Sequence, residues 1–268
     1  MDTVIISDLH LGSDVSRARD AVRLLRQLRF RRLVLLGDIF CDLNFARLKK
    51  EHWKFLSCIR KLSNPRRGVE VVWVEGNHDE GISRVLSHLV GIRVYQQYAW
   101  TYAGKRHLAI HGHQFDRFAV NNWLLSSLGA WFYLQLQKIE PGERHLTRWL
   151  DKLNSAWLRL SPKVAEGALE FAAQRGVDRI FCGHTHQPMQ VEKNGVCYYN
   201  SGAWIHDSAS YITVSDEGVQ IHAYQPDEFE PAYHRGPGEE REPVAALAAD
   251  LAPPSGLPAD AEYESVCS

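Results

Sequence analysis

The sequence places aspartate, histidine and asparagine side chains at short spacing in five separate segments. In each segment they follow a glycine or alternate with one other residue. The residues concerned are Asp8, His10, Asp38, Asn77, His78, Asp79, His111, His184 and His186. Carboxylates and imidazoles without thiolates suit Mn, Fe or Zn better than Ca or Mg. Two such ions about 3.5–4 Å apart can acidify a water and hold two oxygens of a phosphoryl group, so the pattern predicts hydrolysis of a phosphate ester.

Asp38 and Asn77 offer two different oxygen ligands. The carboxylate of Asp38 can use both oxygens to bridge two ions, whereas the neutral carbonyl oxygen of Asn77 limits the charge of the ligand set. Gly37 and Gly76 come directly before them. Because glycine adopts backbone conformations closed to other residues, both positions are expected to form tight turns.

A histidine on its own is weak evidence for a metal site. His52, His88 and His145 stand alone and are interpreted as ordinary surface or core residues. The five segments differ, because Asp-x-His, Gly-Asp, Gly-Asn-His-Asp, His-Gly-His and Gly-His-Thr-His occur in this order, each after an apolar segment. Such an arrangement favours a shared site.

The apolar segments that precede these clusters are typical of buried strands. Strands are expected at residues 3–6, 33–36, 69–74, 92–95, 98–102, 107–110, 179–182, 197–199, 211–214 and 219–223, and helices at 16–30 and 46–62. Short continuous apolar runs bounded by turn residues favour a layered α/β fold. Because ligand sites in open α/β sheets form at the carboxyl ends of strands, the five clusters are expected to meet at one edge.

Two further regions stand apart from this alternation. Residues 117–178 are expected to form a helical insertion, with Trp123, Trp131, Trp149 and Trp157. The insertion is either a helical pair buried against the domain or a cap over the site with an apolar groove. Residues 226–268 hold seven of the eleven prolines and no hydrophobic period. They are expected to be a disordered tail, which leaves residues 1–225 as the folded domain.

The composition narrows the class of protein. The 268 residues carry 31 Lys and Arg against 32 Asp and Glu, a formal net charge of −1. This lacks the basic surplus usual in nucleic-acid binders, so no nucleic-acid partner is expected. The five cysteines include no Cys-x-x-Cys pair, which predicts reduced thiols in the cytoplasm. No signal peptide or membrane-spanning run is expected.

The clusters together resemble the signature of the calcineurin-like metallophosphoesterase superfamily over residues 4–223. The resemblance implies an α/β fold, a four-layer α/β/β/α sandwich of two packed sheets with helices outside. It also implies two divalent metal ions, Mn in the first place, with Fe or Zn as alternatives. By the family pattern, one ion would be held by Asp8, His10, Asp38 and His186, and the other by Asp38, Asn77, His111 and His184.

The same resemblance implies a hydrolase in which a hydroxide bridging the metals attacks phosphorus. His78 would contact the phosphate and protonate the leaving oxygen, and Asp79 would orient His78. Asn200, Ser201 and Trp204 are expected at the rim of the site.

A narrower resemblance links SDLHLG, GNHDE, HGHQFD, GHTH, NSGAW and the helical insertion to relatives of UDP-2,3-diacylglucosamine pyrophosphatase. It implies cleavage of a diphosphate in a nucleotide-linked lipid, with the insertion covering the acyl chains. Those pyrophosphatases carry Arg in place of His78 and Asp in place of His113. Substrate contacts are expected from His113, Arg117, Trp131 and Phe132. His113 could instead lie behind the ligands, and Asp116 could hydrogen-bond a ligand imidazole.

Two other functions remain open from the sequence. One is a general phosphodiesterase, phosphomonoesterase or protein phosphatase, and the other is a metal-bound module without turnover. The expected partner is a small-molecule phosphoester, lipid-linked or not, and no obligate protein partner is evident. An apolar insertion also permits peripheral contact with the inner face of a membrane.

Overall fold

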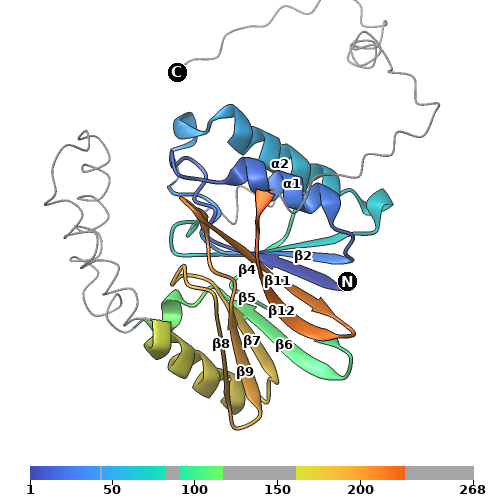
Figure 1. The fold of residues 1–268 in the computed structure, drawn as a ribbon, viewed down its shortest axis with the longest axis vertical. Helices are drawn as coiled ribbons and strands as arrows, with labels where there is room; N and C mark the ends of the chain where they lie inside the picture. Colours follow the sequence, from blue (N-terminus) through green and yellow to red (C-terminus); the bar gives the residue numbers. More distant parts are fainter. Residues whose placement is uncertain (43, 82–90, 117–160, 227–268) are drawn as a thin grey trace, which may run out of the picture. The chain divides into compact units, whose positions relative to one another are not determined.

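The computed structural model describes residues 1–42, 44–81, 91–116 and 161–226. The chain divides into two units, Met1–Glu230 and Pro231–Ser268, and every described residue belongs to the first. Within that unit, strands and helices build two sheets with helices outside them (Figure 1).

The first sheet has seven strands in the order β10-β11-β1-β2-β3-β4, with β12 paired to β11. Its strands are β1 (Thr3–Ile6), β2 (Arg32–Leu36), β3 (Glu70–Val74), β4 (Val94–Tyr95), β10 (Trp204–Ile205), β11 (Ser208–Ser215) and β12 (Gly218–Ala223). β1 to β4 run parallel, and β11 is antiparallel to β1. The carboxyl ends of β1, β2 and β3 therefore lie at the same edge.

The second sheet has five strands in the order β5-β6-β7-β9-β8. They are β5 (Gln97–Tyr102), β6 (Lys105–Ile110), β7 (Arg179–Cys182), β8 (Met189–Lys193) and β9 (Val196–Asn200). The three central strands β6, β7 and β9 are parallel, and the antiparallel strands β5 and β8 form the two edges.

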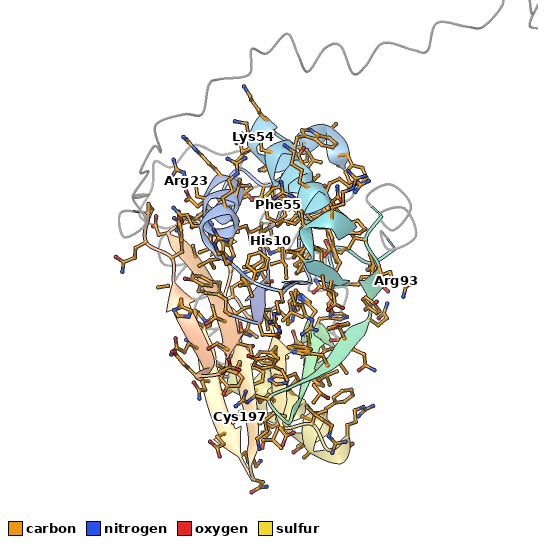
Figure 2. All side chains as sticks on the ribbon, turned by 90° about the vertical axis from the view of Figure 1, so that its right-hand side faces the viewer. His10, Arg23, Lys54, Phe55, Arg93 and Cys197 are labelled. Carbon is orange, nitrogen blue, oxygen red and sulfur yellow. The ribbon has the colours of Figure 1, made fainter. Side chains whose placement is uncertain are left out.

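Alternating side chains give the first sheet two apolar faces. One face, including Ile6 and Leu35, packs against helices α1 (Ala18–Gln27) and α2 (Lys50–Leu62). The other face, including Ile5 and Val34, packs against the second sheet. Figure 2 shows Phe55 of α2 in the interior, whereas Arg23 and Lys54 project from the outer surfaces of the helices. Each large apolar side chain buried in this way stabilises the fold by roughly 1.5–3 kcal/mol.

The outer face of the second sheet has its own cover. Leu108 and Ile180 pack there against Ala168 and Leu169, which belong to the helix formed by residues 161–174. The order of layers is therefore helix, sheet, sheet, helix, which confirms the expected α/β/β/α sandwich. Short 3-10 helices complete the described chain: η1 (Phe45–Arg47), η2 (Pro65–Arg67) and η3 (His113–Phe115).

The expected insertion at residues 117–178 is only partly described. Its end, residues 161–174, is the layer helix on the second sheet. Arg117, Trp131, Phe132 and the rest of residues 117–160 lie outside the described residues, as does the expected tail from residue 227 onward. Cys41, Cys58, Cys182 and Cys197 are free thiols. Across the described part of the chain, no helix has the length and apolar character needed to cross a bilayer.

Candidate metal centre

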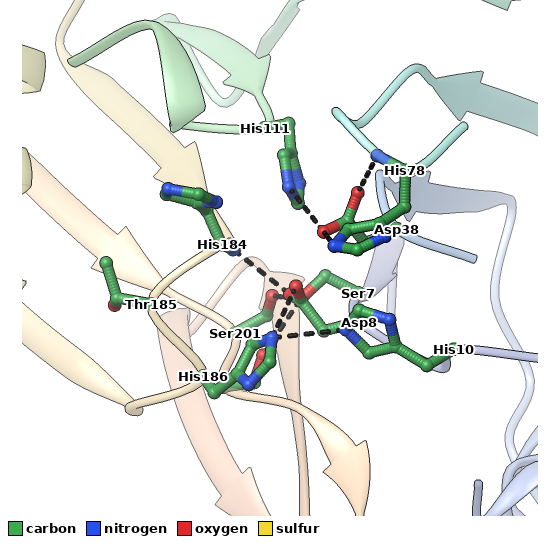
Figure 3. Close-up of polar contacts among 12 residues, drawn as sticks. Ser7, Asp8, His10, Asp38, His78, His111, His184, Thr185, His186 and Ser201 are labelled. Atoms are coloured by element: carbon green, nitrogen blue, oxygen red, sulfur yellow. Dashed lines mark hydrogen bonds and ion pairs between the residues drawn. The ribbon is translucent and has the colours of Figure 1, made fainter. Parts of the chain in front are cut away.

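The predicted ligand clusters all follow strands whose carboxyl ends meet. Asp8 and His10 come after β1, Asp38 after β2, and His78 after β3. From the second sheet, His111 follows β6, while His184 and His186 follow β7. Figure 3 shows these side chains gathered around Asp8 and Asp38. The expectation that the clusters converge at one place is confirmed.

Five of these residues have a left-handed backbone, which is uncommon outside glycine. Their φ angles are 52° at Asp8, 47° at His10, 51° at Asp38, 67° at His184 and 56° at His186. Such conformations cost of order 1 kcal/mol or more each and persist only where the surroundings impose them. Here the loops hold one another, since Asp8 N–H donates to Gly37 O and His10 N–H donates to Asp38 O, at 3.1 and 3.0 Å.

Two glycines permit this close packing in different ways. Gly37 has a φ of 77°, as a tight turn requires, and a Cβ there would also overlap the ring of His111. Gly76 does not have a positive φ, so the expected turn is not its reason. A Cβ on Gly76 would instead collide with the backbone nitrogen and Oδ1 of Asp38. Gly76 is thus needed for the close approach of two loops.

Asp8, His10 and His186 form the first candidate ligand group. His186 Nε2 lies 3.2 Å from Asp8 Oδ1 and 3.2 Å from His10 Nε2. Three ligand atoms so close together, two of them ring nitrogens, leave a natural position for one cation between them.

Asp38, His111 and His184 form the second candidate group. His111 Nε2 lies 3.3 Å from Asp38 Oδ2, and His111 Nδ1 lies 3.0 Å from Leu36 O. A proton on Nδ1 donated to that carbonyl fixes the ring and directs Nε2 toward Asp38. His184 is oriented in a similar way, because its Nε2 lies 3.4 Å from Asp116 Oδ2. The suggested contact between Asp116 and a ligand imidazole is therefore present.

The charges and unsatisfied atoms of these groups fit divalent cations. Asp8 Oδ1 and His111 Nε2 are buried and have no hydrogen-bond partner among the described residues. Burial works against a charge on Asp38, but the imidazoles around it hold its pKa well below the usual value. Burial would lower the pKa of His111, yet Asp38 and Asp8 raise that pKa to about 10. A metal ion would take the place of that proton, since ligating histidines must be deprotonated.

His78 lies on the solvent-exposed side of the metal centre. Its backbone N–H donates to Asp38 Oδ1 at 2.9 Å, and its Nδ1 lies 2.8 Å from Cys41 O. Its Nε2 is 3.9 Å from Asp38 Oδ2, and its side chain is 36% exposed. The ring is therefore anchored at one nitrogen while the other remains accessible. His78 also forms a third candidate ligand group with His10 and Asp38.

Asp79 does not orient His78 as the sequence suggested. Its carboxylate is fully buried and accepts the backbone N–H groups of Ile39 and Phe40, at 3.0 and 2.8 Å. The described residue that holds the ring of His78 is Cys41, through its carbonyl oxygen. Adjacent residues in a bend point in different directions, so the carboxylate of Asp79 does not face the ring of His78. Its two hydrogen bonds instead fix the loop that follows β2.

The remaining predicted residues have varied positions. Asn77 lies on the exposed part of the bend after β3, and its role as a ligand stays a prediction. His113 is in η3, its ring centroid 5.5 Å from that of His111, and its buried Nδ1 has no hydrogen-bond partner among the described residues. Burial and the neighbouring rings of His111 and His184 lower the pKa of His113 to about 4. A neutral His113 therefore stands beside the second ligand group.

Three buried polar residues lie behind the ligands, and of these only Ser7 was not singled out from the sequence. Asn200 and Ser201, expected at the rim, are fully buried, as are Ser7 and the apolar Trp204. The Asn200 amide donates to Gly183 O at 2.6 Å and so fixes the Gly-His-Thr-His loop. The signal was a polar Asn-Ser-Gly sequence directly after an apolar strand, the same placement that marked the ligands.

The chain matches one protein family. The calcineurin-like phosphoesterase family matches residues 1–188 of the chain. The search of the curated proteins gave no match.

Several solved structures have a similar course of the chain. A phosphoesterase from E. coli, Yfce, is 18% identical, with 82% of this chain and 91% of that chain covered and a TM-score of 0.48. A novel archaeal phosphodiesterase is 14% identical, with 84% and 100% covered and a TM-score of 0.46. Vps29 from Entamoeba histolytica in complex with Zn²⁺ is 16% identical, with 84% and 98% covered and a TM-score of 0.43. The family match over 188 residues carries the assignment: the chain belongs to the calcineurin-like phosphoesterase family.

Proposed function

We propose that the protein hydrolyses phosphate esters or diphosphates with two divalent metal ions. The observation that supports this most directly is the arrangement of two ligand groups, Asp8/His10/His186 and Asp38/His111/His184, around buried carboxylates with unsatisfied ligand atoms. Ions bound there would polarise the phosphoryl oxygens and supply an acidified water. Asn77 is proposed as an additional ligand of the second group. Mn is the first candidate, with Fe or Zn as alternatives.

His78 is the proposed general acid. Its Nδ1–H donates to Cys41 O, so Nε2 is the atom that can donate to a leaving oxygen. Its partial exposure supports a role in contact with substrate, whereas the proposed ligand His111 is fully buried. A positioned imidazole of this kind contributes about 10²–10⁴-fold to a rate.

The substrate we propose is a nucleotide-linked lipid such as UDP-2,3-diacylglucosamine, or a similar diphosphate. The support is the resemblance of SDLHLG, GNHDE, HGHQFD and GHTH, together with the apolar sequence of residues 121–137, including Trp131 and Phe132. His113 and Arg117 are proposed substrate contacts. A cytoplasmic enzyme at the inner face of the membrane would meet such a substrate.

The test is an assay of the metal-stripped protein after separate return of Mn, Fe, Co, Zn or Mg. Each form is offered bis-p-nitrophenyl phosphate, p-nitrophenyl phosphate and UDP-2,3-diacylglucosamine, with Asp38→Ala as the blank. His222→Gln is the matched control, because His222 lies on β12 and contacts Thr213, away from the ligand groups.

Each outcome selects one function. Release of UMP from the lipid substrate supports the pyrophosphatase. Turnover of the simple esters alone keeps a phosphoesterase and removes the lipid. No turnover with any metal, despite bound ions, would favour a metal-bound module instead.

A further inference from the structure

Ser7 and Ser201 form a pair of buried hydroxyls directly behind Asp8. Both side chains are 0% exposed, and their Oγ atoms lie 2.7 Å apart (Figure 3). Ser7 is the last residue before Asp8 after β1, whereas Ser201 follows β9 on the other sheet. Neither residue belongs to a ligand group, and the proposed chemistry does not use them.

The two carboxylate oxygens of Asp8 have different surroundings. Oδ2 accepts a hydrogen bond from Ser7 Oγ and another from the backbone N–H of His184, the latter at 3.1 Å. Oδ1 is buried without a hydrogen-bond partner in the described chain and lies 3.2 Å from His186 Nε2. Because Oδ2 is already satisfied by two donors, Oδ1 is the oxygen left for a cation.

Ser7 Oγ has a single proton and more than one acceptor within reach. Ser7 Oγ can donate to Asp8 Oδ2 or to Gly202 O, which is 2.9 Å away. A charged acceptor forms the stronger hydrogen bond, so the carboxylate is favoured. Ser201 Oγ can then donate to the oxygen of Ser7, and its other acceptor, Cys182 O, is more distant at 3.3 Å. The hydroxyls thus form a chain from Ser201 through Ser7 to Asp8.

The packing leaves little freedom for this chain to rearrange. A Cβ on Gly183 would lie 2.5 Å from Asp8 Oδ2 and 2.6 Å from Ser7 Oγ. The loop that carries His184 and His186 therefore rests on the Ser7–Asp8 contact. The hydroxyl pair connects three segments: the end of β1, the loop after β7 and the segment after β9.

We infer that Ser7 is a positioning residue that, with Ser201 behind it, turns the carboxylate of Asp8 so that Oδ1 faces the ion of the first ligand group. The inference rests on the proposed metal-dependent function. Partners of this kind behind metal ligands typically change metal affinity about 10–100-fold.

Calorimetric titration of the metal-stripped full-length protein with Mn²⁺ measures the metal affinity and tests this inference without relying on activity. Ser7→Ala is expected to weaken the affected site about 10–100-fold, and Ser201→Ala by less, because Ser7 keeps its own contact. The Ser7→Ala/Ser201→Ala double variant is expected to be no weaker than Ser7→Ala, since Ser201 acts through Ser7.

Ser210→Ala is the matched control. Ser210 is also a buried hydroxyl, and it donates to Ser201 O at 2.7 Å without touching Asp8. Its Mn²⁺ affinity is expected to equal that of the wild type. The melting temperature of each metal-free variant separates loss of fold from loss of orientation.

Unchanged Mn²⁺ affinity of a folded Ser7→Ala would overturn the inference, and so would additive losses in the double variant. If Ser7→Ala does not fold, Ser201→Ala decides, and wild-type affinity there overturns the inference as well. A wild type that binds Mn²⁺ but hydrolyses no substrate would contradict the proposed function alone. The role of Ser7 would still be tested, because the Mn²⁺ affinities of the serine variants do not depend on activity.

Discussion

His107 and His111 are buried four residues apart on and just after the same strand, yet their surroundings are opposite. His107 is 1% exposed and stacks against Trp100 and Phe181, with ring centroids 5.0 and 5.7 Å away. Burial lowers its pKa to about 4. His111 is 0% exposed but lies against Asp38, and its pKa is raised to about 10.

The difference shows that a buried histidine becomes a metal-ligand candidate through its neighbours. Inside the sheet pair, His107 packs against apolar rings, and burial keeps it neutral. At the carboxyl end of β6, the same residue type meets two carboxylates brought there by β1 and β2. A cation is favoured at the second place and excluded from the first.

Removal of the charge beside His111 should have the largest effect. Asp38→Asn is expected to raise the free-energy barrier to hydrolysis by several kcal/mol and so to lower the rate about 10³-fold or more. The reason is that Asp38 belongs to two ligand groups. In the metal-free variant, NMR titration should show the pKa of His111 falling toward that of His107. The control is Asp178→Asn, a surface carboxylate paired with Lys105. Full activity in Asp38→Asn would refute the role of this carboxylate.

His78 adds a partly exposed histidine to the comparison of His107 with His111. His78→Gln is expected to lower kcat about 10²-fold or more with both metals retained. The loss should be greater for an alkyl phosphate than for p-nitrophenyl phosphate, since a poor leaving group depends more on a proton donor. Metal content by elemental analysis accompanies the kinetics. Loss of a metal ion would instead make His78 a ligand.

The pair His111→Gln and His107→Gln tests the comparison itself. We expect His111→Gln to weaken metal binding about 10–100-fold. His107→Gln should leave metal binding unchanged and lower the free energy of unfolding by about 1–3 kcal/mol, because an amide cannot stack as the ring does. Metal titration and urea denaturation measure the two effects. Equal effects of both variants on metal affinity would contradict the distinction.

Acid should destabilise the protein through His107. Its folded-state pKa, about 4, is below the unfolded value of 6.5, so its contribution is complete above pH 6.5 and is lost as pH falls toward 4. The loss is roughly 3 kcal/mol. Arg179, whose Nη1 lies 3.4 Å from Nε2, opposes protonation further. Urea denaturation of metal-free His107→Phe should show a flatter pH dependence, and an unchanged slope would count against a neutral buried His107.

Much of the fold could be predicted from short apolar runs. The expected strands at 3–6 and 179–182 coincide with β1 and β7, and most others differ by one or two residues. β8 was missed because Met189–Lys193 is half-exposed at a sheet edge and shows no apolar run. The helix of residues 161–174 was assigned to the insertion, because its packing partner, the second sheet, is not evident from local sequence.

The convergence of the candidate ligand clusters could be predicted because each cluster lies within a few residues and follows a strand. The groups behind them could not, since Ser7 and Ser201 meet across 194 positions of sequence. Asp79 was misjudged for the opposite reason: its neighbour in sequence is not its partner in space. His52 is a buried histidine outside the ligand set, as expected, and its Nδ1 accepts the backbone N–H groups of Gly12 and Lys49.

The central claim is that Asp8/His10/His186 and Asp38/His111/His184 each hold one ion. The most direct measurement is the number of Mn²⁺ ions bound per chain, by titration of the stripped protein with electron paramagnetic resonance. The account predicts two ions, with the spin coupling of neighbouring metals, and loss of that coupling in Asp38→Asn. A single uncoupled ion, or two ions unaffected by Asp38→Asn, would contradict it.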